Sequence, residues 1–203
     1  MSNGFTLLKV KNKAKTAEDL LPDEVKIELP KYGRVNTLIT TFEELILELE
    51  KDGFKIKKAT SAEEFVKNSK NLEKKDILVD NALFGVLAFG SSCNLSELKV
   101  TKLNKLVLQD RASCLPPIVL RPTEGQTILD CCAAPGNKTH QLAQYVGSGG
   151  KVLACEADPK RFKLLLNRME LLGAGQIVEA KLQNFFDINP LSKPWCDVTK
   201  VGI

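Results

Sequence analysis

The stretch that decides the fold reads Asp130-Cys131-Cys132-Ala133-Ala134-Pro135-Gly136-Asn137-Lys138-Thr139. We expect a strand over Thr127–Leu129 before it and a helix over Thr139–Tyr145 after it. Open α/β sheets bind ligands at strand-to-helix loops of this kind, because small residues let the backbone approach a ligand and a helix N-terminus offers free N–H groups to an anion. The stretch therefore predicts a cofactor-binding loop.

The sequence after this loop continues to alternate between strand and helix patterns. We expect a strand over Val152–Cys155, a helix from about Arg161 to Leu172 and a strand over Ile177–Ala180. Strands that alternate with helices over this length favour a parallel, doubly wound sheet. The fold class is α/β, with a Rossmann-like domain in residues 106–203.

A carboxylate, Glu156, follows the second of these strands. An acid at that strand end is placed to accept hydrogen bonds from both hydroxyls of a ribose. Glycine placement then separates the nucleotide ligands. A nicotinamide site needs G-x-G-x-x-G and a P-loop needs Gly-Lys-Ser/Thr, whereas the loop has only Gly136, and Asn137 precedes Lys138. A loop without these glycines suits a ligand without a pyrophosphate, such as S-adenosylmethionine. An ordinary turn beside a surface acid is an equally good explanation on spacing alone.

The N-terminal half predicts a small α/β module. Val35–Ile39 has the pattern of a strand, and the capping-box pair Thr41 and Glu44 starts a helix that ends before Gly53. A strand around Ile56, a second capping-box pair and a strand at Ile77–Val79 follow. We therefore expect a lead-in over 1–30, a small α/β subdomain over 31–105 that includes a connector at 81–105, and the Rossmann-like domain over 106–203.

Composition excludes several classes. Lys and Arg outnumber Asp and Glu only 29 to 25, so charge alone does not establish nucleic-acid binding. The six cysteines form no CxxC pair and His140 is the single histidine, so no metal site is expected. We expect His140 to be a surface residue. No signal peptide or membrane span is predicted, which favours an intracellular protein with reduced thiols and no membrane partner.

The segment from Asp130 to Thr139 resembles the signature of the NSUN/RsmB (Sun-domain) family of RNA cytosine-5 methyltransferases, and its Asn137 resembles the branch that modifies large-subunit ribosomal RNA. Three further segments are similar to family motifs: Arg34-Val35-Asn36-Thr37-Leu38, Gln109-Asp110-Arg111-Ala112-Ser113-Cys114-Leu115-Pro116 and Glu156-Ala157-Asp158-Pro159-Lys160-Arg161. The resemblance implies an RNA-binding small subdomain, S-adenosylmethionine as cofactor, RNA as partner and a nucleolar location. It leaves the oligomeric state open.

The resemblance also implies roles for individual residues. The methionine part of the cofactor would be held by Cys132, Ala133, Ala134, Pro135, Gly136, Asn137 and Lys138. Glu156 would bind the ribose, and Arg161 would add a polar contact. Asn184 stands where the family has an acid for the adenine amino group, with Asp187 as the alternative.

The family uses two cysteines, in an Asp-Pro-Ser-Cys and a Thr-Cys-Ser segment, to attack cytosine and to release the product. The chain contains neither segment, and Cys196 follows Trp195 instead of Ser or Thr. We therefore expect no catalytic residue and an incomplete methyltransferase domain, in which the strand Thr127–Leu129 is left partly unpaired at a sheet edge. The alternative is a non-catalytic RNA- or cofactor-binding protein.

Overall fold

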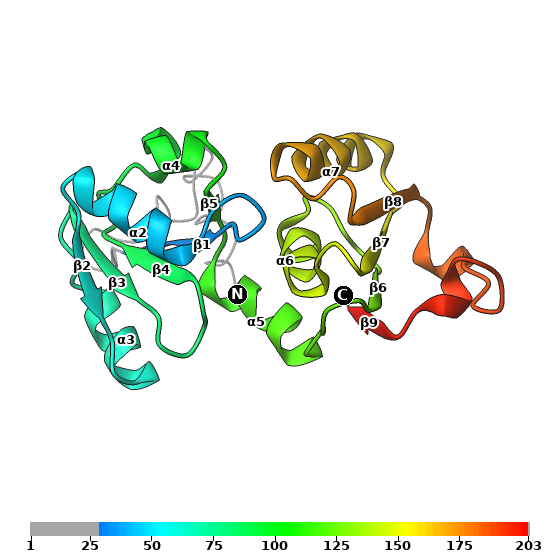
Figure 1. Cartoon of the computed structure of the whole chain (residues 1–203), viewed down its shortest axis with the longest axis horizontal. Coiled ribbons are helices and arrows are strands. Elements are labelled where there is room, and N and C mark those ends of the chain that lie inside the picture. Colours follow the sequence, from blue (N-terminus) through cyan, green and yellow to red (C-terminus); the bar gives the residue numbers. More distant parts are fainter. Residues whose placement is uncertain (1–28, 203) are drawn as a thin grey trace, which may run out of the picture.

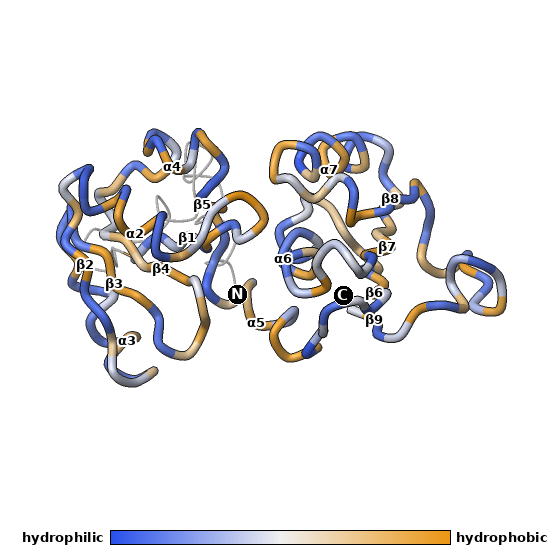
Figure 2. The backbone as a smooth tube through the Cα atoms, viewed as in Figure 1, coloured by the Kyte–Doolittle hydropathy of each residue, from blue (hydrophilic) through white to orange (hydrophobic). Residues whose placement is uncertain are grey.

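The computed structural model describes residues 29–202 of the chain. Figure 1 shows two lobes that lie side by side and are joined by helix α5 (Arg111–Leu120). All but the last two positions of the lead-in expected over residues 1–30 fall outside the described residues. Figure 2 shows that hydrophobic residues are concentrated within strands of both lobes, such as β3 (Asp76–Val79) and β7 (Lys151–Glu156).

The N-terminal lobe is built on a five-stranded sheet in the order β2-β3-β4-β1-β5. Neighbouring strands are antiparallel, except that β2 and β3 are parallel. Its elements besides β3 are β1 (Lys31–Val35), α2 (Phe42–Lys51), β2 (Lys55–Lys58), α3 (Ala62–Ser69), β4 (Val86–Phe89), η3 (Leu95–Glu97), α4 (Lys99–Lys102) and β5 (Leu106–Leu108).

The two predicted capping boxes differ in the structure. The Thr41 hydroxyl accepts from Glu44 N while the Glu44 carboxylate accepts from Thr41 N, which completes the box at the start of α2. Ser61 accepts from Glu64 N, but the Glu64 carboxylate accepts from Thr60 N instead of Ser61 N. Both helices therefore begin as predicted, and only the first has the reciprocal pair.

Three expectations for this lobe were wrong. The strand lies at Lys31–Val35, not Val35–Ile39, because Asn36 accepts from Leu38 N and starts a turn. The segment 81–105 is not a connector, since it contains β4, the central strand of the sheet. All four β4 residues are buried, and a strand buried on both faces lacks the alternating pattern that reveals strands. The domain boundary after Lys105 separates β5 from β1, to which β5 pairs.

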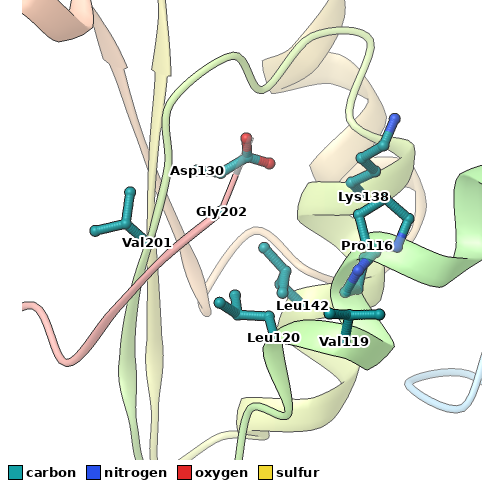
Figure 3. A pocket seen from close by; sticks show the side chains of 9 residues that line it. Pro116, Val119, Leu120, Asp130, Lys138, Leu142, Val201 and Gly202 are labelled. Carbon is teal, nitrogen blue, oxygen red and sulfur yellow. The ribbon is translucent and has the colours of Figure 1, made fainter.

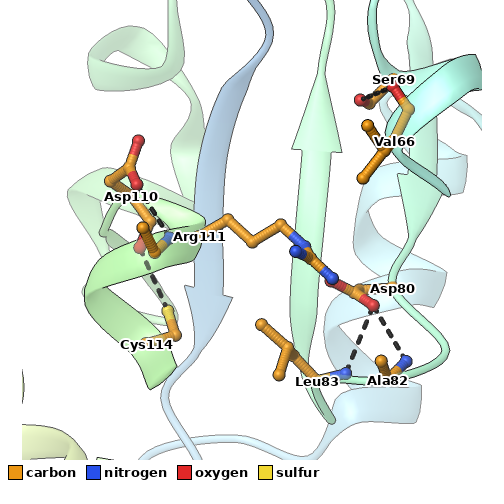
Figure 4. Close-up of polar contacts among 9 residues, drawn as sticks. Val66, Ser69, Asp80, Ala82, Leu83, Asp110, Arg111 and Cys114 are labelled. Carbon is orange, nitrogen blue, oxygen red and sulfur yellow. Dashed lines mark hydrogen bonds and ion pairs between the residues drawn. The ribbon is translucent and has the colours of Figure 1, made fainter. Parts of the chain in front are cut away.

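Helix α5 is anchored to the N-terminal lobe by an ion pair. Arg111 Nε donates to Asp80 Oδ2 at 2.6 Å, and Asp80 Oδ1 accepts from Ala82 N at 2.9 Å (Figure 4). The Asp80 side chain is fully buried, so its partners replace the water that the carboxylate loses. The start of α5 therefore belongs structurally to the N-terminal lobe.

The C-terminal lobe contains a four-stranded, entirely parallel sheet in the order β8-β7-β6-β9. Its elements besides β7 are β6 (Thr127–Asp130), α6 (Asn137–Val146), α7 (Pro159–Leu171), β8 (Val178–Leu182), η4 (Phe185–Asp187), η5 (Trp195–Asp197) and β9 (Lys200–Gly202). This arrangement confirms the α/β class and the parallel sheet.

The two faces of this sheet are covered differently. Helices α6 and α7 pack on one face through Leu142, Val146, Leu165 and Met169. The other face is covered by the segment after β8, whose Phe185, Ile188, Trp195 and Val198 pack against Leu129 and Leu153. Short 3-10 turns thus take the place that helices have in a regular doubly wound fold.

The expectation that β6 is left as a partly unpaired edge was wrong. Strand β9 pairs with it in parallel register from Ile128↔Lys200 to Asp130↔Gly202, and Cys131 N donates to Gly202 O at 3.0 Å. Trp195 and Val198, both partly buried, pack on the sheet and bring the chain back to β6. None of the helices in the described residues is long and apolar enough to cross a membrane.

Candidate cofactor site

The predicted loop is closed at its base by two buried polar residues. Asp130, the last residue of β6, is 2% exposed, and the Thr139 hydroxyl donates to its Oδ2 at 2.7 Å. Cys132 N lies 3.3 Å from Asp130 Oδ1. Burial raises the pKa of the Asp130 carboxyl. These contacts fix both ends of the loop that spans Cys131 to Lys138.

Gly136 is the position of the loop at which a side chain would be strained and would contact α7. Its φ is +101°, a conformation that side chains rarely adopt, and it lies at the start of α6. A Cβ atom there would lie 2.6 Å from Met169 Cε and 3.0 Å from Leu165 Cδ1, both on α7. The glycine therefore lets the loop lie directly on α7. No side chain of the described residues caps α6, so its first N–H groups remain available to an anion.

Glu156 lies at the carboxyl end of β7 and is 5% exposed. Its Oε1 accepts from Asp158 N at 2.9 Å, whereas its Oε2 has no hydrogen-bond partner among the described residues. Arg161 Nη1 lies 3.6 Å from that Oε2, too far for a hydrogen bond, and Arg161 Nη2 donates to Ala134 O at 2.5 Å. A buried carboxylate oxygen without a hydrogen-bond partner fits a ligand that presents hydroxyl groups, such as a ribose.

The remaining predicted residues have defined positions. Asp158 caps α7 as expected, because its Oδ1 accepts from Lys160 N and Arg161 N. Asn137 Oδ1 accepts a hydrogen bond from Arg168 Nη2, a contact that the sequence did not indicate. Asn184 is exposed beyond β8, and its Oδ1 accepts from Phe186 N at 3.0 Å. Asp187 is also exposed, so neither side chain is fixed by a buried partner.

A cavity of about 440 Å³ lies beside the loop, between α5, α6 and β9. Figure 3 shows its largely apolar wall, to which the side chains of Leu120 and Leu142 contribute. Asp130 and Lys138 are the charged residues in the lining, whereas Glu156 and Arg161 are not part of it. The cavity therefore adjoins the loop on the side of α5.

The thiols of the chain are mostly in environments that disfavour a thiolate. Burial raises the pKa of Cys93, and it raises the pKa values of Cys114, Cys131 and Cys155 to about 11. Cys132 and Cys196 are exposed, and Cys196 Sγ lies 3.8 Å from the Asp197 carboxylate. Within residues 29–202 no group of three His, Cys, Asp or Glu side chains could hold a metal ion.

The expectation that His140 is a surface residue was wrong. It is completely buried between the lobes, with Nδ1 3.0 Å from Arg34 Nη2 and Nε2 3.1 Å from Asn36 Oδ1. The helical position alone did not show this, because the surface that covers His140 comes from a strand about a hundred residues earlier. The signal in the sequence that could have indicated its burial was that His140 lies among neutral amide side chains on one side of α6.

Two family models match the chain. Residues 29–109 match "NOL1/NOP2/Sun domain family member 5, ferredoxin-like domain", and residues 117–189 match "16S rRNA methyltransferase RsmB/F". The two matched ranges correspond to the two lobes, because the first ends just after β5 and the second begins within α5.

Curated relatives and solved structures agree with these models. A 28S rRNA (cytosine-C(5))-methyltransferase of Mus musculus is 32% identical over 94% of this chain and 41% of its own length. A 25S rRNA (cytosine-C(5))-methyltransferase of Schizosaccharomyces pombe is 31% identical over 97% and 40%. The chain thus spans about two fifths of these relatives.

The fold is shared with a methyltransferase homologue from Pyrococcus horikoshii, whose crystal structure has a TM-score of 0.60 at 24% identity and covers 77% of this chain and 44% of that one. Both family models and the relatives point the same way. The chain belongs to the NSUN/RsmB family of S-adenosylmethionine-dependent RNA cytosine-5 methyltransferases.

Proposed function

We propose that this chain binds S-adenosylmethionine and RNA as part of a methyltransferase that modifies cytosine C5 in large-subunit ribosomal RNA. The observation that carries the cofactor assignment is the buried Glu156 Oε2, which has no hydrogen-bond partner among the described residues. The RNA assignment is supported by the names of the mouse and fission yeast relatives. A eukaryotic enzyme with this substrate would work in the nucleolus.

Each part of the proposed cofactor site has a separate task. S-adenosylmethionine would supply an electrophilic methyl group. The uncapped start of α6 would bind its carboxylate, since the N–H groups there carry partial positive charge. Glu156 would accept from the ribose hydroxyls, and Asn184 or Asp187 would accept from the adenine amino group. Arg161 holds the loop against Glu156 through Ala134 O.

Replacing Glu156 with alanine should weaken S-adenosylmethionine binding roughly tenfold or more, because hydrogen bonds to a charged group contribute about 1.5–3 kcal/mol. Isothermal titration calorimetry on wild type and Glu156→Ala measures this. The matched control is Glu179→Ala in neighbouring β8, whose carboxylate pairs with Lys151 and Lys181 at the surface. The control should bind like wild type. Equal affinity of the Glu156 variant and wild type would reject the ribose assignment.

We propose that the 203-residue chain by itself transfers no methyl group. C5 methylation needs a thiolate that attacks cytosine C6, and the pKa values of the buried Cys93, Cys114 and Cys155 and of the half-buried Cys131 are raised. Purified protein incubated with ribosomal RNA and tritiated S-adenosylmethionine should give no RNA-bound label. Label that disappears in Cys196→Ser would instead identify Cys196 as a nucleophile.

A second candidate is a non-catalytic protein that binds RNA or the cofactor. It is favoured by the pairing of β9 with β6, because β6 then has a hydrogen-bonded neighbour on each side. The two candidates differ in one measurable respect. Methyl transfer by a longer form of the protein to its RNA supports the enzyme, whereas cofactor binding without transfer by that form supports the binding protein.

A further inference from the structure

Segments that are far apart in the sequence meet between the lobes. Arg34 and Asn36 come from the end of β1, Gln109 from the residue after β5, and His140 and Gln141 from the first turns of α6. The exposed fractions of these five residues lie between 0% and 3%. We call them the inter-lobe cluster. They are polar groups shielded from water, so their hydrogen bonds must come from one another or from the backbone.

Arg34 determines the direction of the hydrogen bonds at His140. A guanidinium can only donate, so Arg34 Nη2 donates to His140 Nδ1 at 3.0 Å. The imidazole therefore carries its proton on Nε2, which donates to Asn36 Oδ1 at 3.1 Å. Asn36 Nδ2 in turn donates to Leu172 O at 3.0 Å, beyond the end of α7. The three side chains thus connect β1 to both helices of the C-terminal lobe.

A second branch continues from the same guanidinium. Arg34 Nε donates to Gln109 Oε1 at 3.1 Å, and Gln109 Nε2 donates to Gln141 Oε1 at 2.9 Å. Gln141 Nε2 then donates to Cys114 O on α5 at 3.0 Å. Each of these hydrogen bonds has one compatible direction. A buried network in which each donor has an acceptor specifies a single relative placement of its elements.

No carboxylate pairs with Arg34 within the described residues. Burial lowers the pKa of Arg34 to about 10, and its acceptors are the neutral Gln109, Val35 O and His140. A buried cation held by neutral acceptors is stable only while all of those acceptors stay in place. The cluster is therefore sensitive to any displacement of α6.

Helix α6 also carries the proposed cofactor loop at its N-terminus, and His140 follows that loop directly. We propose that Arg34, Asn36 and His140 are positioning residues, which fix the start of α6 against the N-terminal lobe and thereby hold the cofactor loop in its binding conformation. The N-terminal lobe then contributes to cofactor binding without touching the cofactor. This step rests on the proposed function, because it takes the loop as the S-adenosylmethionine site.

The test uses three variants of the whole chain. His140→Leu removes both hydrogen bonds, and Asn36→Ala removes one of them together with the contact to Leu172 O. His140→Asn is the milder variant, since an amide oxygen near the Nδ1 position still accepts from Arg34. The control is Leu49→Ala, which removes a completely buried side chain from the core of the N-terminal lobe and is not part of the cluster.

Hydrogen exchange gives the first measurement and needs no cofactor. We expect faster exchange of the amides in residues 131–143 for His140→Leu and Asn36→Ala, and wild-type exchange there for Leu49→Ala. Calorimetry gives the second measurement. S-adenosylmethionine affinity should fall roughly five- to fiftyfold in His140→Leu, less in His140→Asn, and not at all in Leu49→Ala. A general loss of stability would affect the control equally.

The outcomes separate the two proposals. Unchanged exchange in residues 131–143 of both His140→Leu and Asn36→Ala overturns the positioning role, whether or not wild type binds the cofactor. If the variants exchange faster in residues 131–143 but the wild-type chain binds no S-adenosylmethionine, the positioning of the loop stands and the proposed function is overturned. Altered exchange with unchanged affinity overturns the contribution of the N-terminal lobe to cofactor binding.

Discussion

Replacing Gly136 with alanine is expected to destabilise the protein by about 1–3 kcal/mol and to abolish measurable S-adenosylmethionine binding. The added Cβ would lie 2.6 Å from Met169 Cε and 3.0 Å from Leu165 Cδ1. Met169 and Leu165 are 2% and 0% exposed, so they have little room to move. The positive φ of Gly136 adds strain for any other residue. Either the Met169 and Leu165 side chains or the loop must shift, and we expect a shift of the loop to move the uncapped start of α6.

Two other glycines separate these causes. Gly53 has a φ of +82°, and no atom of the described residues would lie within 4 Å of an added Cβ, so Gly53→Ala measures the cost of the backbone conformation alone. A Cβ added at Gly149 would come no closer than 3.9 Å to any atom of the described residues, so Gly149→Ala should be nearly neutral. Urea denaturation gives the three free energies of unfolding, and calorimetry gives the affinities. Wild-type stability and affinity in Gly136→Ala would contradict the packing of the loop on α7.

Lowering the pH from 7 to 5 is expected to reduce the free energy of unfolding by about 2 kcal/mol through His140 alone. Burial and then the positive charge of Arg34 lower the pKa of His140 from 6.5 to about 3, with a further contribution from Arg168. The unfolded chain takes up a proton near pH 6.5, while the folded chain keeps the imidazole neutral. The stabilisation is thus complete above pH 6.5 and falls by about 1.4 kcal/mol per unit as the pH decreases toward 3.

Since His140 is the only histidine, this effect can be isolated. Urea denaturation at several pH values between 7 and 5 should show the slope in wild type and lose most of it in His140→Asn. This window lies above the ordinary pKa values of carboxylates, which limits their contribution. In an NMR titration, the single imidazole signal should stay constant over the same range. A titration midpoint near 6.5 in the folded protein would contradict the buried, neutral state.

Local sequence was sufficient for much of the C-terminal lobe. The strands and helices around the loop lie within a few residues of the predicted positions, because helix caps, apolar runs and the Pro-Gly turn act over short distances. Asp158 caps α7 for the same reason. The roles of Glu156 and Arg161 toward a cofactor stay predictions, although the structure brings both residues to the loop.

Strand β4 and strand β9 could not be identified in this way. The four residues of β4 are buried on both sides, so their sequence has no period that distinguishes a strand from another apolar segment. Strand β9 has three residues and is defined by its pairing with β6 and by the packing of Trp195 and Val198. Pairing partners that are distant in the sequence leave no mark on a local pattern.

By itself, the sequence determined the α/β class, the alternation of strands and helices in the C-terminal lobe, and the strand-to-helix loop from Asp130 to Thr139, because each depends on interactions between near neighbours. Only the tertiary structure decided the environment of His140. There Arg34 and Asn36 contact the imidazole, and Gln109 accepts a hydrogen bond from Arg34. A side chain is buried by whatever packs on it. For His140 that surface comes from another lobe, whose position is set by the whole fold.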